Sequence, residues 1–560
     1  MSFFHPHQNA IAMNVRTPLV EYSIVMIVLY ILVVLISWPL GFDNTLLASS
    51  LLEGDLGYTI FIQWWSGEQI LQFDSLSRNI QVQYPIGTDA MRYLFNLPVL
   101  ILTVPFQWLF DPIQAYNQSM LGIMVLNGLS GYHFGRRFGQ TQGWLCAIAI
   151  CALPFPWHEL GKGRLEQGFV APLILWLDSI HAFKKSGAWK DAGFYLALVT
   201  NCYWFYGPMA LLLLPIIAPR EMMQYRKQTL YLLGLCTLLC LPQVAYIWPL
   251  LEQFERSHAF DDPMYLQTQM ENSWMPNHSI PYVSLYKVGG IPILIGICML
   301  YSSNRKVVLM TLGIAAIFAM GPILGGQQPV EWLGQIWQLP HALLNHLPFV
   351  RRFYWPYRWL VLLAPAVCLA MSHVKISRSR IPILALGMII EIWILLPVGY
   401  DLNKPTLNAS TYSLPTAGRY ISYTPSTFWR TLPNDHMAIL SLPRSMTDQN
   451  VDQQVLDVAI HQHPMANGLE EMTDNKKFRQ LASQDNGHFY ENWLMMKPLC
   501  QSDWTQSKSF LVEQGFGWIV FYKSRVHDEL TPPNYTCLVQ MLGTPDYSDA
   551  TISAWDIDSH

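Results

Sequence analysis

The sequence predicts a mostly α-helical polytopic membrane protein with about eleven transmembrane helices, followed by a C-terminal external α/β domain. Hydrophobic residues make up 52% of its 560 residues and charged residues only 13%, whereas a soluble globular chain carries roughly 25% charged residues. Apolar runs of membrane length recur through the first 400 residues and then stop. We therefore expect a transmembrane domain over residues 1–400, with a large first external loop at 41–112, and a soluble domain over residues 401–560.

The first apolar run, residues 22–40, has the length that crosses a hydrocarbon core of roughly 30 Å. No small-residue cleavage site follows it, so we expect an uncleaved span and a cytoplasmic N-terminus. The later apolar runs are 113–135, 143–157, 169–183, 191–218, 229–250, 288–301, 307–324, 357–371 and 381–398.

Five clusters of Lys and Arg fix the orientation of these runs, because basic residues concentrate on the cytoplasmic side of a membrane. The clusters are Arg136 with Arg137, Lys184 with Lys185 and Lys190, Arg220 with Arg226 and Lys227, Arg305 with Lys306, and Lys375 with Arg378 and Arg380. One topology places all five inside. It requires residues 191–218 to form a short hairpin, and residues 93–110, broken by Pro98 and Pro105, to form a re-entrant or interfacial segment.

Residues 401–560 contain no further run of membrane length and, after eleven spans, are expected on the external side. Strand-like runs lie at 437–442, 516–522, 536–542 and 552–555, and helical periodicity at 474–483 and 505–514. This mixture predicts an α/β domain.

The cysteines and the net charge bear on the compartment of the protein and on its partners. Seven of the nine cysteines fall in apolar runs, where they are expected to be small core residues. Cys500 and Cys537 lie in the external domain, where an oxidising compartment allows either a disulfide or two free thiols. A formal net charge of −4 without any basic tract argues against nucleic acid as a partner.

The first external loop carries the leading candidate for acid–base chemistry. Asp55 lies in a Gly-Asp-Leu-Gly-Tyr sequence close to the end of the first span. A carboxylate held there could take a proton from an acceptor hydroxyl. The alternative is a helix cap or a solvated loop acid. Four other acids of the same region compete for the role: Asp43, Glu53, Asp74 and Asp89.

The order of motifs along the chain resembles that of a known protein family. The features that carry the resemblance are, in chain order, the first span, Gly54–Asp55, a Tyr-Pro-Ile-Gly sequence at 84–87, a run ending in Arg136–Arg137, a run ending at 154–156, and Gly163 to Glu166. They are similar to the C-type (GT-C) glycosyltransferase superfamily, most closely to its uncharacterised bacterial membrane proteins. Oligosaccharyltransferase catalytic subunits and polyprenyl-phosphate-sugar transferases are more distantly similar.

The resemblance implies a GT-C-like fold and a glycosyltransferase that uses a lipid-linked sugar. It also implies a bacterial inner membrane location, a periplasmic C-terminal domain, and Asp55 as the catalytic base or a metal ligand. Glu166 occupies the family's second acidic position. A divalent cation such as Mg²⁺ or Mn²⁺ is implied only through the oligosaccharyltransferase branch. That branch has Asp-His-His where this chain has Glu166-Gln167, and a zinc pattern such as His-Glu-x-x-His is absent from this loop.

The loop at 157–167 concentrates charge between two predicted spans. Its charged and titratable residues are His158, Glu159, Lys162, Arg164 and Glu166. Lys162 and Arg164 could hold a phosphate while Glu159 or Glu166 orients an acceptor or an ion. The alternative is a set of solvated interfacial residues.

A second basic cluster precedes the run at 357–371. Arg351 and Arg352 are followed by an aromatic stretch and then Arg358, which suits a lipid phosphate, because guanidinium groups bind phosphate oxygens in bidentate fashion. The alternative is simple anchoring to phospholipid headgroups. Tyr84 is a further candidate ligand. Glu391, at mid-span, is expected to make a hydrogen bond inside the bundle or to serve proton coupling.

Two functions fit these observations. The first is an inverting transfer of a sugar from a polyprenyl-phosphate-linked donor to an external acceptor, which can be a lipid, a glycan or a protein, with Asp55 as the base. The second is a non-catalytic transporter or a scaffold for envelope glycan assembly. A transporter needs polar residues at mid-depth, and Glu391 is the one that the sequence offers. The pattern favours the enzyme.

Overall fold

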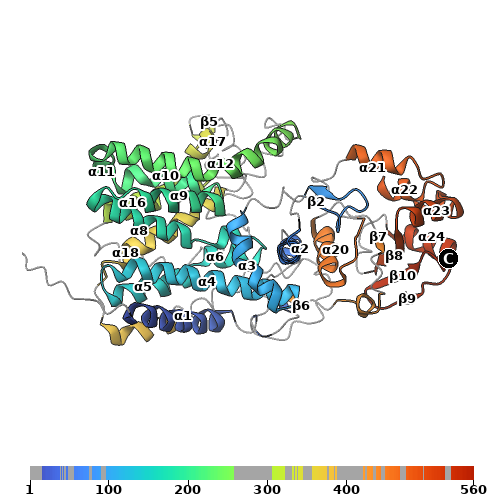
Figure 1. The fold of residues 1–560 in the computed structure, drawn as a ribbon, viewed down its shortest axis with the longest axis horizontal. Helices are drawn as coiled ribbons and strands as arrows, with labels where there is room; N and C mark the ends of the chain where they lie inside the picture. The colour runs from blue at the N-terminus through green and yellow to red at the C-terminus, as the bar shows by residue number, and fades with distance from the viewer. Residues whose placement is uncertain are drawn as a thin grey trace, which may run out of the picture.

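The structure, a computed structural model, describes residues 16–37, 40, 42, 46–47, 56–74, 78–89, 96–257, 305–321, 331–332, 335–336, 338–344, 356–374, 377–383, 385–387, 421–422, 425–432, 437–442, 448–466, 475–495, 497–523 and 531–559. The described part is mostly helical, with a small mixed sheet in the C-terminal region. Figure 1 shows a bundle of roughly aligned helices at one end and the C-terminal region, in orange and red, at the other.

The bundle is built from the N-terminal two thirds of the chain. Its longer elements are α1 (Arg16–Ile36), α3 (Leu97–Leu109), α4 (Pro112–Arg136), α5 (Gln140–Cys151), α8 (Ala171–Ser186), α9 (Lys190–Cys202), α10 (Tyr206–Ile217), α12 (Arg226–Ser257), α16 (Arg305–Ala319) and α18 (Leu363–Met371). Its shorter elements are α6 (Pro154–Gly161), α7 (Leu165–Gly168), α11 (Pro219–Gln224), α17 (Pro340–Leu344), the 3-10 helices η3 (Pro356–Leu362) and η4 (Arg378–Arg380), and the hairpin β4 (Glu331–Trp332) with β5 (Gln335–Ile336).

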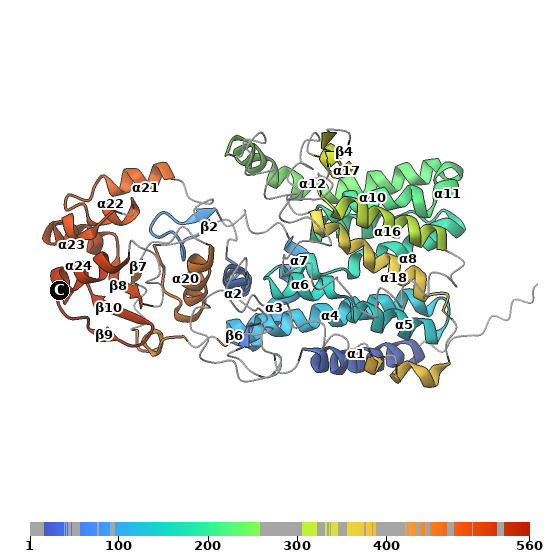
Figure 2. The ribbon, with the colours of Figure 1, turned by 180° about the vertical axis from the view of Figure 1, so that it is seen from behind.

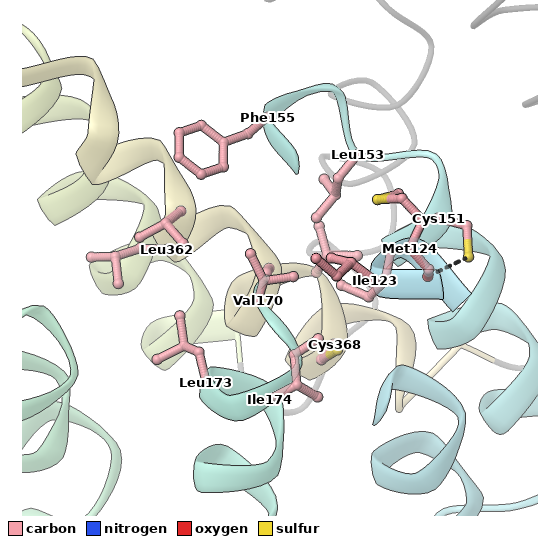
Figure 3. Close-up of a cluster of buried hydrophobic side chains, with 14 of the residues drawn as sticks. Ile123, Met124, Cys151, Leu153, Phe155, Val170, Leu173, Ile174, Leu362 and Cys368 are labelled. Atoms are coloured by element: carbon pink, nitrogen blue, oxygen red, sulfur yellow. Dashed lines mark hydrogen bonds between the residues drawn. The ribbon is translucent and has the colours of Figure 1, made fainter. Parts of the chain in front are cut away.

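Helix α4 forms the centre of the bundle, and glycines bring α5 against it. A Cβ atom at Gly135 would lie 2.4 Å from the backbone oxygen of Gln142, and one at Gly131 would lie 3.0 Å from that of Cys146. The neighbouring core continues around Met124, Cys151 and Leu362, as Figure 3 shows. This close approach leaves α4 buried on nearly all sides.

Two described helices are long and apolar enough to cross a membrane, Leu19–Ile36 and Arg226–Ala245. Three shorter apolar helices are Leu97–Leu109, Tyr206–Ile217 and Pro356–Met371. The prediction of about eleven spans is therefore not met in the described part of the chain.

The shortfall has a physical cause. Helix α4, at 25 residues, is long enough, but it carries amide side chains such as Asn117 and Asn127, which its position inside the bundle allows. Other predicted spans form helices that are too short: α5 has 12 residues and ends at Cys151, and α8 has 16 residues and ends at Ser186, followed by Gly187 in a left-handed conformation. The predicted run at 288–301 and Glu391 lie outside the described residues.

The C-terminal region holds one four-stranded sheet in the order β7–β8–β10–β9. Its strands are β7 (Ala438–Leu442), parallel to β8 (Phe516–Tyr522), then β10 (Ile552–Asp556) and β9 (Tyr547–Ser548), both antiparallel to their neighbours. Three predicted strands, 437–442, 516–522 and 552–555, are thereby confirmed. The fourth, 536–542, is wrong, because those residues lie in helix α24 (Thr531–Leu542). Pro532 and Pro533 suit a helix start, and buried Leu538 and Leu542 are one helical turn apart.

Helices cover this sheet. They are α20 (Asp448–His461), α21 (Asn475–Ala482), α22 (Phe489–Leu494), α23 (Trp504–Glu513) and α24, with the 3-10 helices η5 (Thr427–Arg430) and η7 (Leu499–Gln501). The two helices predicted at 474–483 and 505–514 are confirmed as α21 and α23. Cys500 and Cys537 form a disulfide with Cα atoms 5.1 Å apart, which joins η7 to α24.

The first loop is interwoven with the C-terminal region. Strand β1 (Leu46–Leu47) pairs with β6 (Ile421–Ser422), and the turn after β2 (Arg78–Asn79), before β3 (Thr88–Asp89), contacts Met465. Helix α2 (Leu56–Gln72) lies between the bundle and α20, across the direction of the bundle helices, in both Figure 1 and Figure 2. The predicted domain boundary at residue 400 falls outside the described residues.

Candidate functional site

The charged loop of the sequence forms α6, a tight turn and α7. Pro154 begins α6, where its missing N–H is not needed. The helix ends at a turn in which Gly163 has a φ of +84° and the Arg164 N–H donates to the Glu159 carbonyl at 2.9 Å. This bond, five residues apart, is the pattern that closes a helix with a left-handed glycine. It returns Arg164 to the turn that carries Glu159.

Side chains of three other helices suspend this segment, residues 158–168, which we call the charged segment. Four of its backbone carbonyls each accept a hydrogen bond from such a side chain. The bonds run from Tyr116 to Leu160, from Thr59 to Gly163 (2.6 Å), from Tyr206 to Gln167 (2.7 Å) and from Asn127 to Gly168 (2.8 Å). The backbone of the charged segment is therefore held in one conformation, which fixes where its charged side chains begin.

Glu159 is the most unusual group in the segment. Its side chain is fully buried, and in the described part of the chain neither carboxylate oxygen has a partner at hydrogen-bonding geometry, with the Tyr357 hydroxyl close enough to interact with it. The nearest cation is Arg164, whose Nη1 atom lies 3.7 Å from Oε2. The same Nη1 donates to the Tyr357 hydroxyl at 3.0 Å. A buried carboxylate that lacks hydrogen bonds is costly, so such groups concentrate at functional sites.

Arg358 brings a second guanidinium, more deeply buried than that of Arg164, to the same place. It is 4% exposed, donates from Nη1 to the Tyr203 hydroxyl, and lies 5.5 Å above the centre of the Tyr203 ring. Arg358 follows Tyr357 in η3, so this short helix delivers to the charged segment both a cation and a hydroxyl partner for Arg164.

The ring of His158 lies among the cations of the site. Its ring meets the Tyr357 ring edge to face at 5.9 Å. Burial, and then the positive charges of Lys162, Arg164 and Arg358, together lower the pKa of His158 to about 3. His158 is therefore neutral at physiological pH, and three cations act on one ring.

Glu166 differs from Glu159, because Asn96 and Gln167 each donate an amide hydrogen bond to it at 3.1 Å. The structure thus brings together His158, Glu159, Lys162, Arg164 and Glu166 with Arg358, six of the predicted site residues. Asp55, Arg351 and Arg352 lie outside the described residues, as do the competing acids Asp43 and Glu53.

Tyr84 does not join the site. Its ring packs edge to face on Phe516 of β8 at 5.5 Å, and its backbone N–H donates to Met465. The reason is that the Tyr-Pro-Ile-Gly turn belongs to the part of the first loop that packs into the C-terminal region.

Sequence interpretation missed the neutral partners of the site. Tyr203, Tyr206 and Tyr357 lie at breaks or starts of apolar runs, and Asn127 lies within one. A hydroxyl or an amide inside an apolar run must find a partner, and that is the signal that could have identified them.

The described residues contain no group of three or more His, Cys, Asp or Glu side chains that could hold a metal ion. At the charged segment, two carboxylates stand among three cations, a donor set that does not suit a divalent cation. Asp55, the metal ligand that the resemblance implies, lies outside the described residues.

No family model and no curated protein matches the sequence. Among solved structures, the chain is similar to the archaeal oligosaccharyltransferase AglB from Archaeoglobus fulgidus in complex with an inhibitory peptide and a dolichol-phosphate. The TM-score is 0.42 and the identity 13%, over 90% of this chain and 69% of that one. The same archaeal enzyme tethered to an acceptor peptide gives a TM-score of 0.42 at 11% identity, over the same shares. Likeness of this degree assigns neither a family nor an activity to the chain.

Proposed function

We propose that the protein is a membrane glycosyltransferase that takes a sugar from a polyprenyl-phosphate-linked donor and transfers it to an external acceptor. The observation that carries the proposal is the charged segment together with Arg358 of η3. Lys162, Arg164 and Arg358 lie near Glu159, a fully buried carboxylate on a backbone that side-chain hydrogen bonds hold in place. The resemblance to GT-C glycosyltransferases in the order of the sequence motifs supports it independently.

The cations are the ligands for the phosphate of the donor. Arg164 and Arg358 offer guanidinium groups, which bind phosphate oxygens in a bidentate fashion that an ammonium group cannot reproduce. Lys162 adds a third positive charge next to His158. When Arg358 is counted with the charged segment, three positive charges stand against the two negative charges of Glu159 and Glu166, a balance that favours an anion.

Asp55 is the proposed base. It precedes Leu56, the first residue of α2, and Thr59 one turn later bonds to the charged segment. The Asp55 carboxylate takes the proton of the acceptor hydroxyl, whose oxygen bonds to the anomeric carbon on the face opposite the phosphate. The bond from that carbon to the phosphate oxygen breaks and its electron pair leaves with the carrier phosphate, so the anomeric configuration inverts.

The setting of the reaction is proposed with it. The donor reaches the site from a bacterial inner membrane, membrane lipids surround the bundle, and the C-terminal domain faces the periplasm. The acceptor is a lipid, a glycan or a protein presented on that side. Exposed apolar side chains on α1, such as Leu19, Ile24 and Ile27, suit contact with lipid.

A transfer assay in membranes of the native host tests the function. Membranes that contain the protein are incubated with a panel of radiolabelled undecaprenyl-phosphate hexoses, and the label that moves to an acceptor is measured. We expect transfer from at least one donor, and about a hundredfold slower transfer in Asp55→Asn, the usual share of a general base. Arg479→Gln, an exposed arginine on α21, is the matched control and should transfer normally.

If donors bind to the protein but no label is transferred from any of them, the enzyme hypothesis is contradicted and the scaffold or transporter is favoured. Full transfer by Asp55→Asn would remove Asp55 as the base.

A further inference from the structure

Helix α2 connects the C-terminal region to the charged segment. On one side its apolar residues pack in a cluster with α20, in which Tyr58, Phe61 and Ile62 join Val455 and Val458. These side chains are buried, so the two helices share a small core of their own. A shift of α20 is therefore transmitted to α2.

Thr59 gives α2 its contact with the site. Its hydroxyl donates to the Gly163 carbonyl at 2.6 Å, across 104 residues of sequence. The three other donors that suspend the charged segment, Tyr116, Asn127 and Tyr206, come from α4 and α10 inside the bundle. Among these four, Thr59 lies on the helix that shares a buried cluster with Val455 and Val458 of α20.

The accepting carbonyl stands at a sensitive point. Gly163 holds the left-handed φ of +84° that closes α6, and the next residue is Arg164. The peptide plane between them carries the oxygen that Thr59 binds and the N–H that closes the turn onto Glu159 at 2.9 Å. Rotation of this plane would move the start of the Arg164 side chain, so a bond to its oxygen fixes the direction of the guanidinium.

We infer that Thr59 is a positioning residue, whose hydrogen bond fixes the start of α2 relative to Arg164. Through this bond the C-terminal region is coupled to the phosphate-binding cations. The inference rests on the proposed function, because it gives Arg164 a ligand to bind. It goes further, because it says how a change in the C-terminal region, such as the binding of an acceptor, alters the affinity for the donor.

The test measures the affinity of the full-length protein in nanodiscs for undecaprenyl phosphate. Thr59→Val removes the hydroxyl and keeps the shape, and we expect about fivefold weaker binding, the share of one neutral hydrogen bond. Thr59→Ser should restore the affinity. Thr103→Val on α3 is the control, because it deletes a buried hydroxyl that bonds only within its own helix, to the Leu100 carbonyl, and it should bind normally.

A double-mutant cycle tests the coupling. Val458→Ala opens space between α20 and α2, and it should weaken binding in the wild-type background but have little further effect in the Thr59→Val background. Additive effects would overturn the coupling.

Arg164→Gln separates this inference from the proposed function. If Arg164→Gln weakens binding while Thr59→Val does not, or if Thr59→Ser fails to rescue, the positioning role is wrong and the proposed function stands. If Arg164→Gln itself binds undecaprenyl phosphate normally, the proposed function fails first.

Discussion

Helix α4 carries a polar cluster at each end, and the two clusters differ in how completely their charges are paired. At the C-terminal end, Arg136 lies 2.7 Å from Glu21, and Arg137 contacts both carboxylate oxygens of Asp178. His133 lies 3.5 Å from the same Asp178. Every carboxylate of this cluster has an arginine in contact, so the cluster ties α1, α4 and α8 together.

At the other end of α4, the charged segment has a similar composition and the opposite arrangement. With Arg358 beside it, three cations stand against two carboxylates, and neither oxygen of Glu159 has a partner at hydrogen-bonding geometry within the described residues. Its closest cation contact, from Arg164, is 3.7 Å. The comparison favours a structural role for the charge at the first end, and at the second end it supports the proposal that the charge serves a ligand.

The largest expected contrast in stability comes from removing one carboxylate at each end. Asp178→Asn should lower the free energy of unfolding by about 1–3 kcal/mol, the range for hydrogen bonds to charged groups, because it breaks the contact with Arg137. Glu159→Gln should change the free energy of unfolding by less than about 1 kcal/mol, since no hydrogen bond is lost. Apparent Tm in nanodiscs measures both. A larger loss in Glu159→Gln than in Asp178→Asn would reverse the comparison.

A smaller difference is expected in how the stability of the protein depends on pH. The pKa of His158 falls from an ordinary 6.5 to about 3, so between these values the unfolded chain binds a proton that the folded protein does not. The stability that follows from keeping His158 neutral is fully present above about pH 6.5 and is lost as the pH falls toward 3. His158→Asn should therefore lose less Tm than the wild type between pH 7 and pH 4.5.

Thr103→Val, which removes no titratable group, provides the control and should follow the wild-type pH dependence. An identical acid sensitivity in His158→Asn and wild type would show that His158 is not shielded as described.

The C-terminal strands were predictable because they are short apolar runs of β-formers between polar turns, as in Phe516–Tyr522. The run at 536–542 has the same appearance, and only the two prolines at its start and the packing of Leu538 show that it is a helix. Within the described residues fewer helices than predicted are long and apolar enough to span a membrane, because a helix surrounded by other helices, such as α4, need not be apolar or have a lipid-facing side.

The site was predictable as a set of charges and not as a set of contacts. The sequence marked Arg164 and Arg358 separately, but 193 residues separate Arg164 from Tyr357, its hydrogen-bond partner, and no local pattern predicts such a pair. The difference between Glu159 and Glu166 was likewise invisible, because it depends on which of them Asn96 reaches in space. Asp178 was not predicted as a site residue. Its partner Arg137 lies 41 residues away in the sequence, so no local pattern predicts the pair.

The most direct test of the account compares two arginines from opposite ends of the bundle in one binding measurement. Arg358→Gln and Arg137→Gln each remove one guanidinium, and the affinity of each variant for undecaprenyl phosphate is measured in nanodiscs beside its Tm. The account predicts about tenfold or greater loss of affinity in Arg358→Gln, from the loss of at least one charge-assisted hydrogen bond, and wild-type affinity with a lowered Tm in Arg137→Gln. Equal affinities in the two variants, or a loss confined to Arg137→Gln, would contradict it.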